Sequence, residues 1–235
     1  MNEPKIHALI PAAGQSVRFG GTTLKQYAHL MGQAVIAHSI EAVRKHPAVN
    51  QVTVALAPDD GIYRDLIRPA YQDVTTVMGG DSRAQTVLNG LRFIRENDPS
   101  CDWVLVHDAA RPCLSSASLQ DLLEQGLATD CGAILAVPVS DTLKLADENG
   151  FIESTVDRSH YWAAQTPQLF PINQLQANLE SAMDSGSTPT DEAAAMERAG
   201  IHPLLVRGSV SNIKITGSED LALAESILRK LMVLE

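Results

Sequence analysis

The first apolar segment of the chain is IHALI, residues 6–10, and it continues directly into PAAGQSVRFGGTTLK, residues 11–25. An apolar run followed by small residues is typical of a buried strand that ends in a loop. Small residues let backbone N–H groups approach an anionic ligand, and Arg18 and Lys25 add charge that can hold a polyphosphate. The stretch therefore predicts a nucleoside triphosphate site at the start of an α/β domain. A glycine-rich turn with two solvated cations is the alternative.

The composition is that of an ordinary globular protein. Of 235 residues, 45% are hydrophobic and 20% are charged, and we expect one domain over residues 1–235. The net charge of −10 argues against broad nucleic-acid binding. We find no apolar run that predicts a signal peptide or a membrane span. Three scattered cysteines without CxxC spacing indicate reduced thiols, so we expect a cytoplasmic protein that does not contact membranes.

Strand-like apolar runs alternate with helix-like patterns along the chain. The expected strands are 6–10, 51–57, 74–78, 103–107, 133–137, 204–206 and 212–215. The expected helices are 34–45, 62–70, 83–96, 116–127, 172–184, 191–199 and 218–234. This alternation predicts an α/β fold with a mostly parallel, twisted sheet that is covered on both faces.

The segment Thr142–Val156 interrupts this alternation. It contains Asn149-Gly150, a pair that favours a tight hairpin turn, between two short β-prone runs. A lone two-stranded hairpin is marginally stable in water, so it must pack against something. A partner subunit is the natural candidate, and packing back on its own domain is the alternative. We therefore expect a protruding β-hairpin arm, at about residues 139–160, that forms a dimer.

In open α/β sheets, ligands bind at the carboxyl ends of the strands. Glycine-rich 79–83 follows one expected strand, residues 108–112 follow the next, and Thr142 follows another. Asp108 stands where a strand meets a loop, and Mg²⁺ is usually bound by one or two carboxylates together with substrate phosphates. A cap on a turn is the alternative role for this carboxylate. Lys214 stands in an apolar pattern, where a lysine is unusual unless it is paired or functional.

Other classes of protein are weaker fits. The segment GDSRA, residues 80–84, resembles the Gly-x-Ser-x-Gly turn of serine hydrolases but has Ala84 in place of the last glycine. A hydrolase would also leave Arg18 and Lys25 unexplained. A nucleotide-binding domain without catalysis is a further alternative, since the fold alone does not exclude it. Arg158 follows the hairpin and either binds an anion across an interface or pairs with Asp157 or Glu153.

Seven motifs occur in a fixed order along nearly the whole chain. They are PAAG (11–14) with Arg18 and KQY (25–27), GGDSR (79–83), VHDAARP (106–112), TVDR (155–158), QTPQ (165–168), TDE (190–192) and NIKIT (212–216). Each motif alone is moderately specific, but the ordered set closely resembles the 2-C-methyl-D-erythritol 4-phosphate cytidylyltransferase family. The resemblance implies a Rossmann-like nucleotidyltransferase fold, a Mg²⁺ requirement and a homodimer with interlocking hairpin arms. It also implies transfer of CMP from CTP to the methylerythritol phosphate, with release of pyrophosphate.

The resemblance further assigns roles to individual residues. The implied catalytic residues are Arg18, Lys25, Arg158 and Lys214. The implied CTP-binding residues are Ala12, Ala13, Gly14, Gly80, Asp81, Thr86 and Asp108, of which Asp108 also holds the metal. The implied acceptor-binding residues are Arg111, Thr142, Arg158, Thr166, Thr190 and Lys214, with Thr142 and Arg158 from the partner subunit.

The chain departs from the usual family pattern at three positions. Ser16 stands where the family usually has glycine, Leu24 where it has proline, and Thr86 where it often has serine. None of these changes removes a charged group, so we expect activity. A ribitol 5-phosphate cytidylyltransferase is the nearest alternative, because it shares the nucleotide half and differs in the acceptor.

Overall fold

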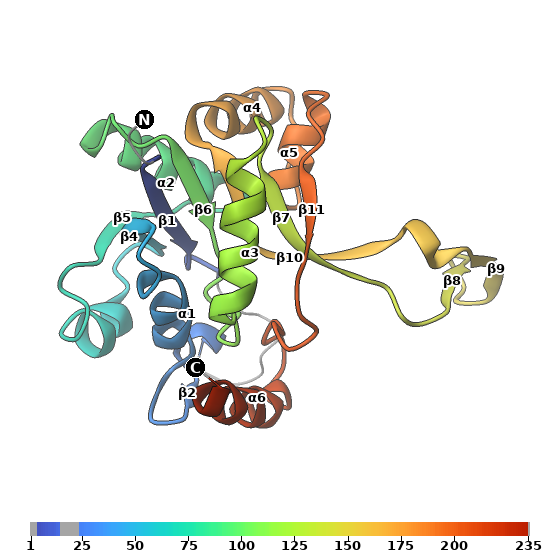
Figure 1. Ribbon diagram of the computed structural model, residues 1–235, viewed down its shortest axis with the longest axis horizontal. Coiled ribbons are helices and arrows are strands. Elements are labelled where there is room, and N and C mark those ends of the chain that lie inside the picture. The colour runs from blue at the N-terminus through green and yellow to red at the C-terminus, as the bar shows by residue number, and fades with distance from the viewer. Residues whose placement is uncertain (1–3, 15–23, 235) are drawn as a thin grey trace.

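The computed structural model of the chain describes residues 4–14 and 24–234. A seven-stranded sheet forms its centre, in the order β11-β7-β10-β6-β1-β4-β5 (Figure 1). The strands are β1 (Ile6–Pro11), β4 (Val49–Leu56), β5 (Thr75–Met78), β6 (Trp103–Val106), β7 (Ala133–Pro138), β10 (Trp162–Pro171) and β11 (Leu204–Arg207). All neighbours pair in parallel except β10, which is antiparallel to both β6 and β7. The predicted α/β fold with a mostly parallel sheet is confirmed.

Helices cover both faces of this sheet. The helices are α1 (Val35–Arg44), α2 (Arg83–Asn97), α3 (Ser116–Leu127), α4 (Ile172–Asp184), α5 (Glu192–Arg198) and α6 (Asp220–Leu234). Strand side chains alternate between faces, so in β1 Ala8 packs in the cluster with α1 and α3, and its neighbour Leu9 packs with α2, α4 and α5. Helix α6 lies at the end of the sheet, where Leu228 packs in a third cluster with Ile215 and Leu30. None of the helices in the described part of the chain is long and apolar enough to cross a membrane.

The strand β10 was missed in the sequence. Its residues WAAQTPQLFP contain two prolines and show no regular alternation, and both features argue against a central strand. The structure accommodates Pro167 because the register with β7 is interrupted between Ala164 and Gln168. Pairing with β6 starts at Gln168, after the proline. The missing N–H of Pro167 therefore falls in the gap of the ladder.

Two other predicted elements differ in the structure. The expected strand Asn212–Ile215 is a loop, held by a hydrogen bond of 2.8 Å from the Ile215 N–H to the Ala110 carbonyl. Ile215 is buried against Val35 of α1 and Leu228 of α6 rather than paired in the sheet. The expected helix 62–70 forms only a short π-helix, Tyr63–Ile67.

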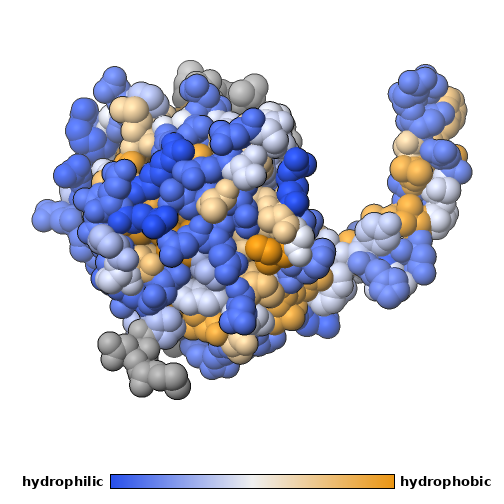
Figure 2. All heavy atoms as spheres, turned by 90° about the horizontal axis from the view of Figure 1, so that it is seen from above, coloured by the Kyte–Doolittle hydropathy of each residue, from blue (hydrophilic) through white to orange (hydrophobic). Residues whose placement is uncertain are grey.

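The predicted arm is present as a separate hairpin of β8 (Leu143–Ala146) and β9 (Ile152–Val156). The arm extends away from the body of the molecule (Figures 1 and 2). Its turn contains Gly150 at φ +84°, a backbone conformation that favours glycine. The side chain of Phe151 is 73% exposed and that of Ile152 is 67% exposed. An apolar hairpin tip that its own domain leaves uncovered is suited to contact with another protein surface.

Candidate functional site

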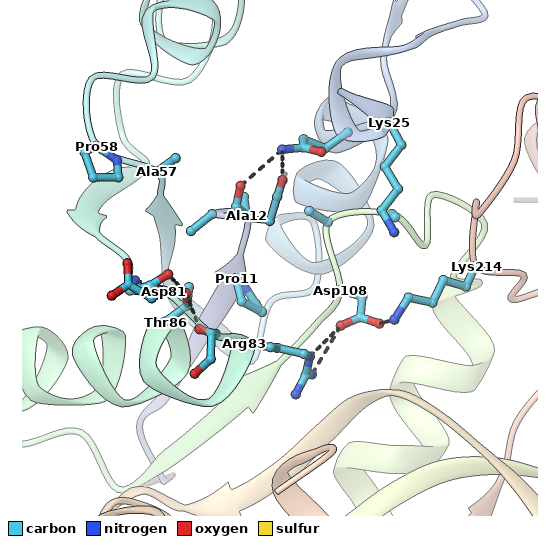
Figure 3. A pocket seen from close by; sticks show the side chains of 17 residues that line it. Pro11, Ala12, Lys25, Ala57, Pro58, Asp81, Arg83, Thr86, Asp108 and Lys214 are labelled. Atoms are coloured by element: carbon cyan, nitrogen blue, oxygen red, sulfur yellow. Dashed lines mark hydrogen bonds and ion pairs between the residues drawn. The ribbon is translucent and has the colours of Figure 1, made fainter. Parts of the chain in front are cut away.

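A cavity of about 590 Å³ opens at the carboxyl ends of the parallel strands (Figure 3). Its walls come from the loops after β1, β4, β5 and β6, with additions from the short 3-10 helix Lys25–Tyr27 and from the loop that carries Lys214. The lining residues include Pro11–Gly14, Lys25, Gln26, Ala57, Pro58, Gly80–Arg83, Thr86, Asp108–Ala110 and Lys214. This is the edge of the sheet at which ligands of open α/β folds bind.

One end of the cavity consists of small residues and backbone. Ala12 is tied to β4 by a hydrogen bond of 2.7 Å from its N–H to the Ala55 carbonyl. The Gln26 side-chain amide donates to the carbonyls of Ala12 at 3.2 Å and Gly14 at 3.3 Å, so the loop enters the site in a fixed direction. Gln26 belongs to the KQY motif, but sequence reasoning assigned it no role. Its contacts depend on the folded position of residues 12–14, which a single sequence does not reveal.

The opposite end of the cavity is charged, and Asp108 lies at its centre. The Lys214 ammonium lies 2.8 Å from Asp108 Oδ2, and Arg83 donates to Oδ1 from Nε at 3.3 Å and from Nη2 at 3.2 Å. Arg111 Nε lies 3.8 Å from Oδ2. Burial opposes ionisation of this carboxyl, but the charges of Arg83 and Lys214 outweigh burial and hold the pKa of Asp108 well below its ordinary range. Lys25 extends toward the same end (Figure 3).

Arg83 connects Asp108 to a second buried carboxylate. Its Nη1 and Nη2 atoms donate to Glu192 at 2.7 and 3.0 Å, while Nε and Nη2 serve Asp108. Burial disfavours the guanidinium charge, yet Glu192 and Asp108 more than offset this effect and raise the pKa of Arg83. Arg83 therefore remains a cation, and it engages one oxygen of Asp108 while the other faces Lys214. Both Arg83 and Glu192 lie in quoted motifs, but sequence reasoning gave neither residue a role.

A chain of hydrogen bonds supports the backbone beneath Asp108. The Asp108 N–H donates to Thr166 Oγ1 at 2.9 Å, and His107 Nε2 lies 3.0 Å from the Arg111 carbonyl. A carbonyl can only accept, so Nε2 carries the proton and His107 Nδ1 accepts from the Thr166 hydroxyl at 3.1 Å. Burial lowers the pKa of His107 to about 4, which keeps the ring neutral near pH 7. Thr166 thus has its hydroxyl engaged in holding the 107–111 loop.

The structure brings together most of the predicted site residues. Those that line the cavity are Ala12, Ala13, Gly14, Lys25, Gly80, Asp81, Thr86, Asp108 and Lys214. Arg111 and Thr166 lie directly behind Asp108. Thr190 is exposed beside the start of α5, and Thr142 and Arg158 are exposed at the arm, so these three do not line this cavity. Arg18 and Ser16 lie outside the described residues.

The comparisons with known proteins agree on one family. The family model described as 2-C-methyl-D-erythritol 4-phosphate cytidylyltransferase matches residues 6–230. The chain belongs to this family. The protein of that name from Shewanella oneidensis is 45% identical over 223 residues, which are 95% of this chain and 88% of the relative. The resemblance inferred from the motifs is confirmed, and so is the prediction of a nucleotidyltransferase enzyme. The hydrolase and non-catalytic alternatives are wrong.

Solved structures give the same result for the fold. A crystal structure of 4-diphosphocytidyl-2C-methyl-D-erythritol synthase superposes with a TM-score of 0.84 at 39% identity, covering 97% of this chain and 100% of the other. The 2-C-methyl-D-erythritol 4-phosphate cytidylyltransferase of Francisella tularensis superposes with a TM-score of 0.79 at 33% identity, covering 95% and 99%. The arrangement of strands and helices around the cavity is therefore that of the family.

Proposed function

We propose that this cavity binds CTP and that the enzyme transfers CMP to 2-C-methyl-D-erythritol 4-phosphate, forming 4-diphosphocytidyl-2-C-methyl-D-erythritol and pyrophosphate. The observation that carries the proposal is the division of the cavity into two ends. Lys25, Lys214 and Asp108 meet at one end, and backbone around Gly80 and Ala13 forms the other. The cationic end suits a triphosphate, and the small-residue end suits a flat base.

The chemistry requires positioning and charge stabilisation rather than a protein nucleophile. An oxygen of the acceptor phosphate attacks the α-phosphorus of CTP. The new P–O bond forms while the bond to the β-phosphate oxygen breaks, and pyrophosphate leaves with that electron pair. The negative charge on the transferred group and on the leaving group is stabilised by cations of the site. Lys25 and Lys214 supply this charge in the described part of the site, and Arg18 is proposed to do the same.

Asp108 is the proposed ligand for Mg²⁺. Within the described residues, no three His, Cys, Asp or Glu side chains are grouped to hold a metal ion. Asp108 is a buried, ionised carboxylate in the wall of the cavity, and Mg²⁺ is commonly held by one carboxylate together with substrate phosphates and water. The donor set therefore fits an ion that arrives with the triphosphate. When bound, the ion neutralises phosphate charge.

The acceptor is proposed to bind where two subunits meet. Arg111 lies beside Asp108 within the chain, whereas Thr142 and Arg158 are exposed at the arm. A homodimer in which each arm reaches the neighbouring cavity would bring Thr142 and Arg158 to the acceptor phosphate. The exposed apolar tip of the arm supports this proposal, since Phe151 and Ile152 would be covered by the second copy.

The three cysteines support a reducing compartment. Cys101, Cys113 and Cys131 are all free thiols, and two of them are buried. Free buried thiols are typical of cytosolic proteins. We therefore propose that the enzyme acts in the cytoplasm.

Pyrophosphate release tests the proposed reaction directly. Purified enzyme with Mg²⁺ and CTP should release pyrophosphate when 2-C-methyl-D-erythritol 4-phosphate is supplied, and the nucleotide product should carry the acceptor. Ribitol 5-phosphate, offered separately, is the control for acceptor choice. Faster turnover with ribitol 5-phosphate would overturn the acceptor assignment, and equal turnover of ATP or GTP would overturn the assignment of CTP.

A further inference from the structure

The Gly79–Gly80 peptide in the cavity wall is held at both of its polar atoms by one helix. Asn89 Nδ2 donates to the Gly79 carbonyl at 2.9 Å, and the Gly80 N–H donates to Thr86 Oγ1 at 3.1 Å. These two groups belong to the same planar peptide unit, so the two bonds together fix its rotation. Both side chains come from α2, at positions three residues apart, which lie on one face of a helix.

The Asn89 side chain is itself fixed in orientation. Gln85 Nε2 donates to Asn89 Oδ1 at 2.7 Å, one helical turn earlier on α2. This bond identifies the oxygen of the Asn89 amide and directs its NH₂ group to Gly79. Thr86 is also fully engaged, because its hydroxyl accepts from Gly80 and lies 2.8 Å from the Ser82 carbonyl, to which it donates.

The Gly79–Gly80 peptide packs closely against the loop after β1, which forms the facing wall of the cavity. A Cβ atom at Gly79 would lie 2.6 Å from Ala13 Cβ and 3.1 Å from the Leu56 carbonyl oxygen. The turn is therefore pressed between α2 and the loop after β1. Gly80 and Asp81, the next residues, line the cavity, whereas Asn89 does not. The position of this peptide sets the spacing and the polarity of the end of the cavity that is made of small residues.

We propose that Asn89 is a positioning residue that sets nucleobase selectivity, because it clamps the Gly79–Gly80 peptide against the base end of the cavity. The inference rests on the proposed binding of CTP. A Gly–Gly peptide rotates more freely than any other, since neither residue has a Cβ. A fixed pattern of backbone donors and acceptors distinguishes a base with an exocyclic amine, such as cytosine, from one with a carbonyl at that position, such as uracil.

The expected effect is on binding and selectivity rather than on the chemical step. Lys25, Asp108 and Lys214 stand on other segments of the chain, so the cationic end should keep its geometry when Asn89 changes. Loss of one neutral hydrogen bond that orders the wall should raise the KM for CTP by about fivefold to tenfold. The preference for CTP over UTP in kcat/KM should fall by a similar factor, and kcat with saturating CTP should stay within about twofold.

Asn89→Asp and Asn89→Ala test the inference with complementary changes. Asn89→Asp keeps the shape and can still accept from Gln85, but it has no N–H for Gly79. Asn97→Ala is the matched control, since Asn97 also stands on α2 and donates to a backbone carbonyl, that of Phe93 at 2.8 Å, but it is exposed and distant from the turn. Steady-state kinetics with CTP and UTP and thermal melting should be measured for all variants.

Both Asn89 variants should show the raised KM and the reduced CTP preference, with Asn97→Ala unchanged. The inference is overturned if a folded Asn89 variant keeps the wild-type CTP to UTP ratio, or if kcat falls as strongly as kcat/KM. If Asn89→Ala fails to fold, the isosteric Asn89→Asp decides. An inactive wild-type enzyme would contradict the proposed function and the inference with it, whereas an active enzyme with an unchanged ratio in the variants would contradict the inference alone.

Discussion

Arg83 and Glu192 form a two-point ion pair, with Nη1–Oε1 at 2.7 Å and Nη2–Oε2 at 3.0 Å, although 109 positions separate them in the sequence. The Glu192 side chain is only 1% exposed. Through this pair, the first turn of α5 holds the guanidinium that also contacts Asp108. The planar guanidinium of Arg83 is held rigidly because both of its edges are hydrogen-bonded. The orientation of Asp108 therefore depends on Glu192, although Glu192 does not line the cavity.

Neutralising this carboxylate should reduce both stability and activity. In Glu192→Gln, Arg83 keeps its charge but loses its buried counterion, and Asp108 loses a fixed neighbour. We expect a loss of about 2–3 kcal/mol in the free energy of unfolding, below the ~3–5 kcal/mol typical of a broken fully buried pair because Arg83 is partly solvated. The kcat should fall by about tenfold, as measured by pyrophosphate release.

Glu180→Gln provides the matched control. Glu180 on α4 also pairs with an arginine of α2, Arg92, at 2.9 Å, but this pair lies at the surface, with the two side chains 34% and 48% exposed. Exposed pairs contribute about 0–1 kcal/mol, so this variant should melt near the wild-type temperature. If the two variants melt together and turn over at the same rate, the Arg83–Glu192 pair does not support the site.

Removing a cation from the phosphate end should slow the chemical step. Lys25→Ala should lower kcat by roughly 10²-fold or more with an unchanged fold, because charge in the transition state loses its partner. Lys214→Ala should act in the same direction and also remove the 2.8 Å contact at Asp108 Oδ2, leaving Arg111 at 3.8 Å. Lys45→Ala, which removes an exposed lysine of a surface pair with Glu41, serves as the control. A near-normal kcat in Lys25→Ala would show that Lys25 does not stabilise charge in the transition state.

Metal removal tests the role of Asp108. Dialysis against EDTA should abolish turnover, and added Mg²⁺ should restore it. Asp108→Asn should need much more Mg²⁺ for half-maximal activity, since a neutral amide is a poorer ligand. Direct Mg²⁺ titration in the presence of CTP provides a readout independent of turnover. An unchanged rate after EDTA treatment would show that the metal assignment is wrong.

Acid should destabilise the protein through His7. Burial lowers the pKa of His7 from 6.5 to about 4, with a partly opposing charge on Asp98. Above pH 6.5 the ring is neutral in both the folded and the unfolded chain, so the free energy of unfolding does not change with pH through His7. Between pH 6.5 and 4 the unfolded chain binds a proton that the folded chain excludes, and stability falls by roughly 2–3 kcal/mol across this window.

Urea unfolding between pH 7 and 4 measures this effect. His7→Gln removes one titrating ring and should make the decline in this window shallower than in wild type, with the remainder including His107, whose pKa burial lowers to the same value. His202→Gln, which changes an exposed residue in a loop, should keep the wild-type slope. An equally steep decline in His7→Gln would assign the acid sensitivity to other groups.

The sequence predicted those parts of the site whose residues directly follow a strand along the chain. Asp108 and Gly80 follow buried strands, and the rule that ligands bind at strand ends placed them together. The strand β10 was missed because Pro167 breaks its pattern and because its antiparallel place between β6 and β7 is set by tertiary packing. Asn212–Ile215 was misread because a loop buried against helices and a strand buried in a sheet leave the same apolar pattern. The bonds of Glu192 to Arg83 and of Asn89 to Gly79 depend on three-dimensional placement, which one sequence does not reveal.

The arm connects oligomeric state to catalysis. Deleting the arm should give monomers of low activity, as size-exclusion chromatography and pyrophosphate release would show. If Arg158 serves the neighbouring site, co-expressed Lys25→Ala and Arg158→Ala chains should form mixed dimers in which one site lacks both groups and the other lacks neither. Such dimers should recover activity well above that of either variant alone. Lys25→Ala chains carrying two different tags, co-expressed and purified in the same way, are the control and should show no recovery. A verified heterodimer without recovery would place Arg158 within its own chain's site, or outside the site, and would remove the shared-site proposal while leaving the family assignment intact.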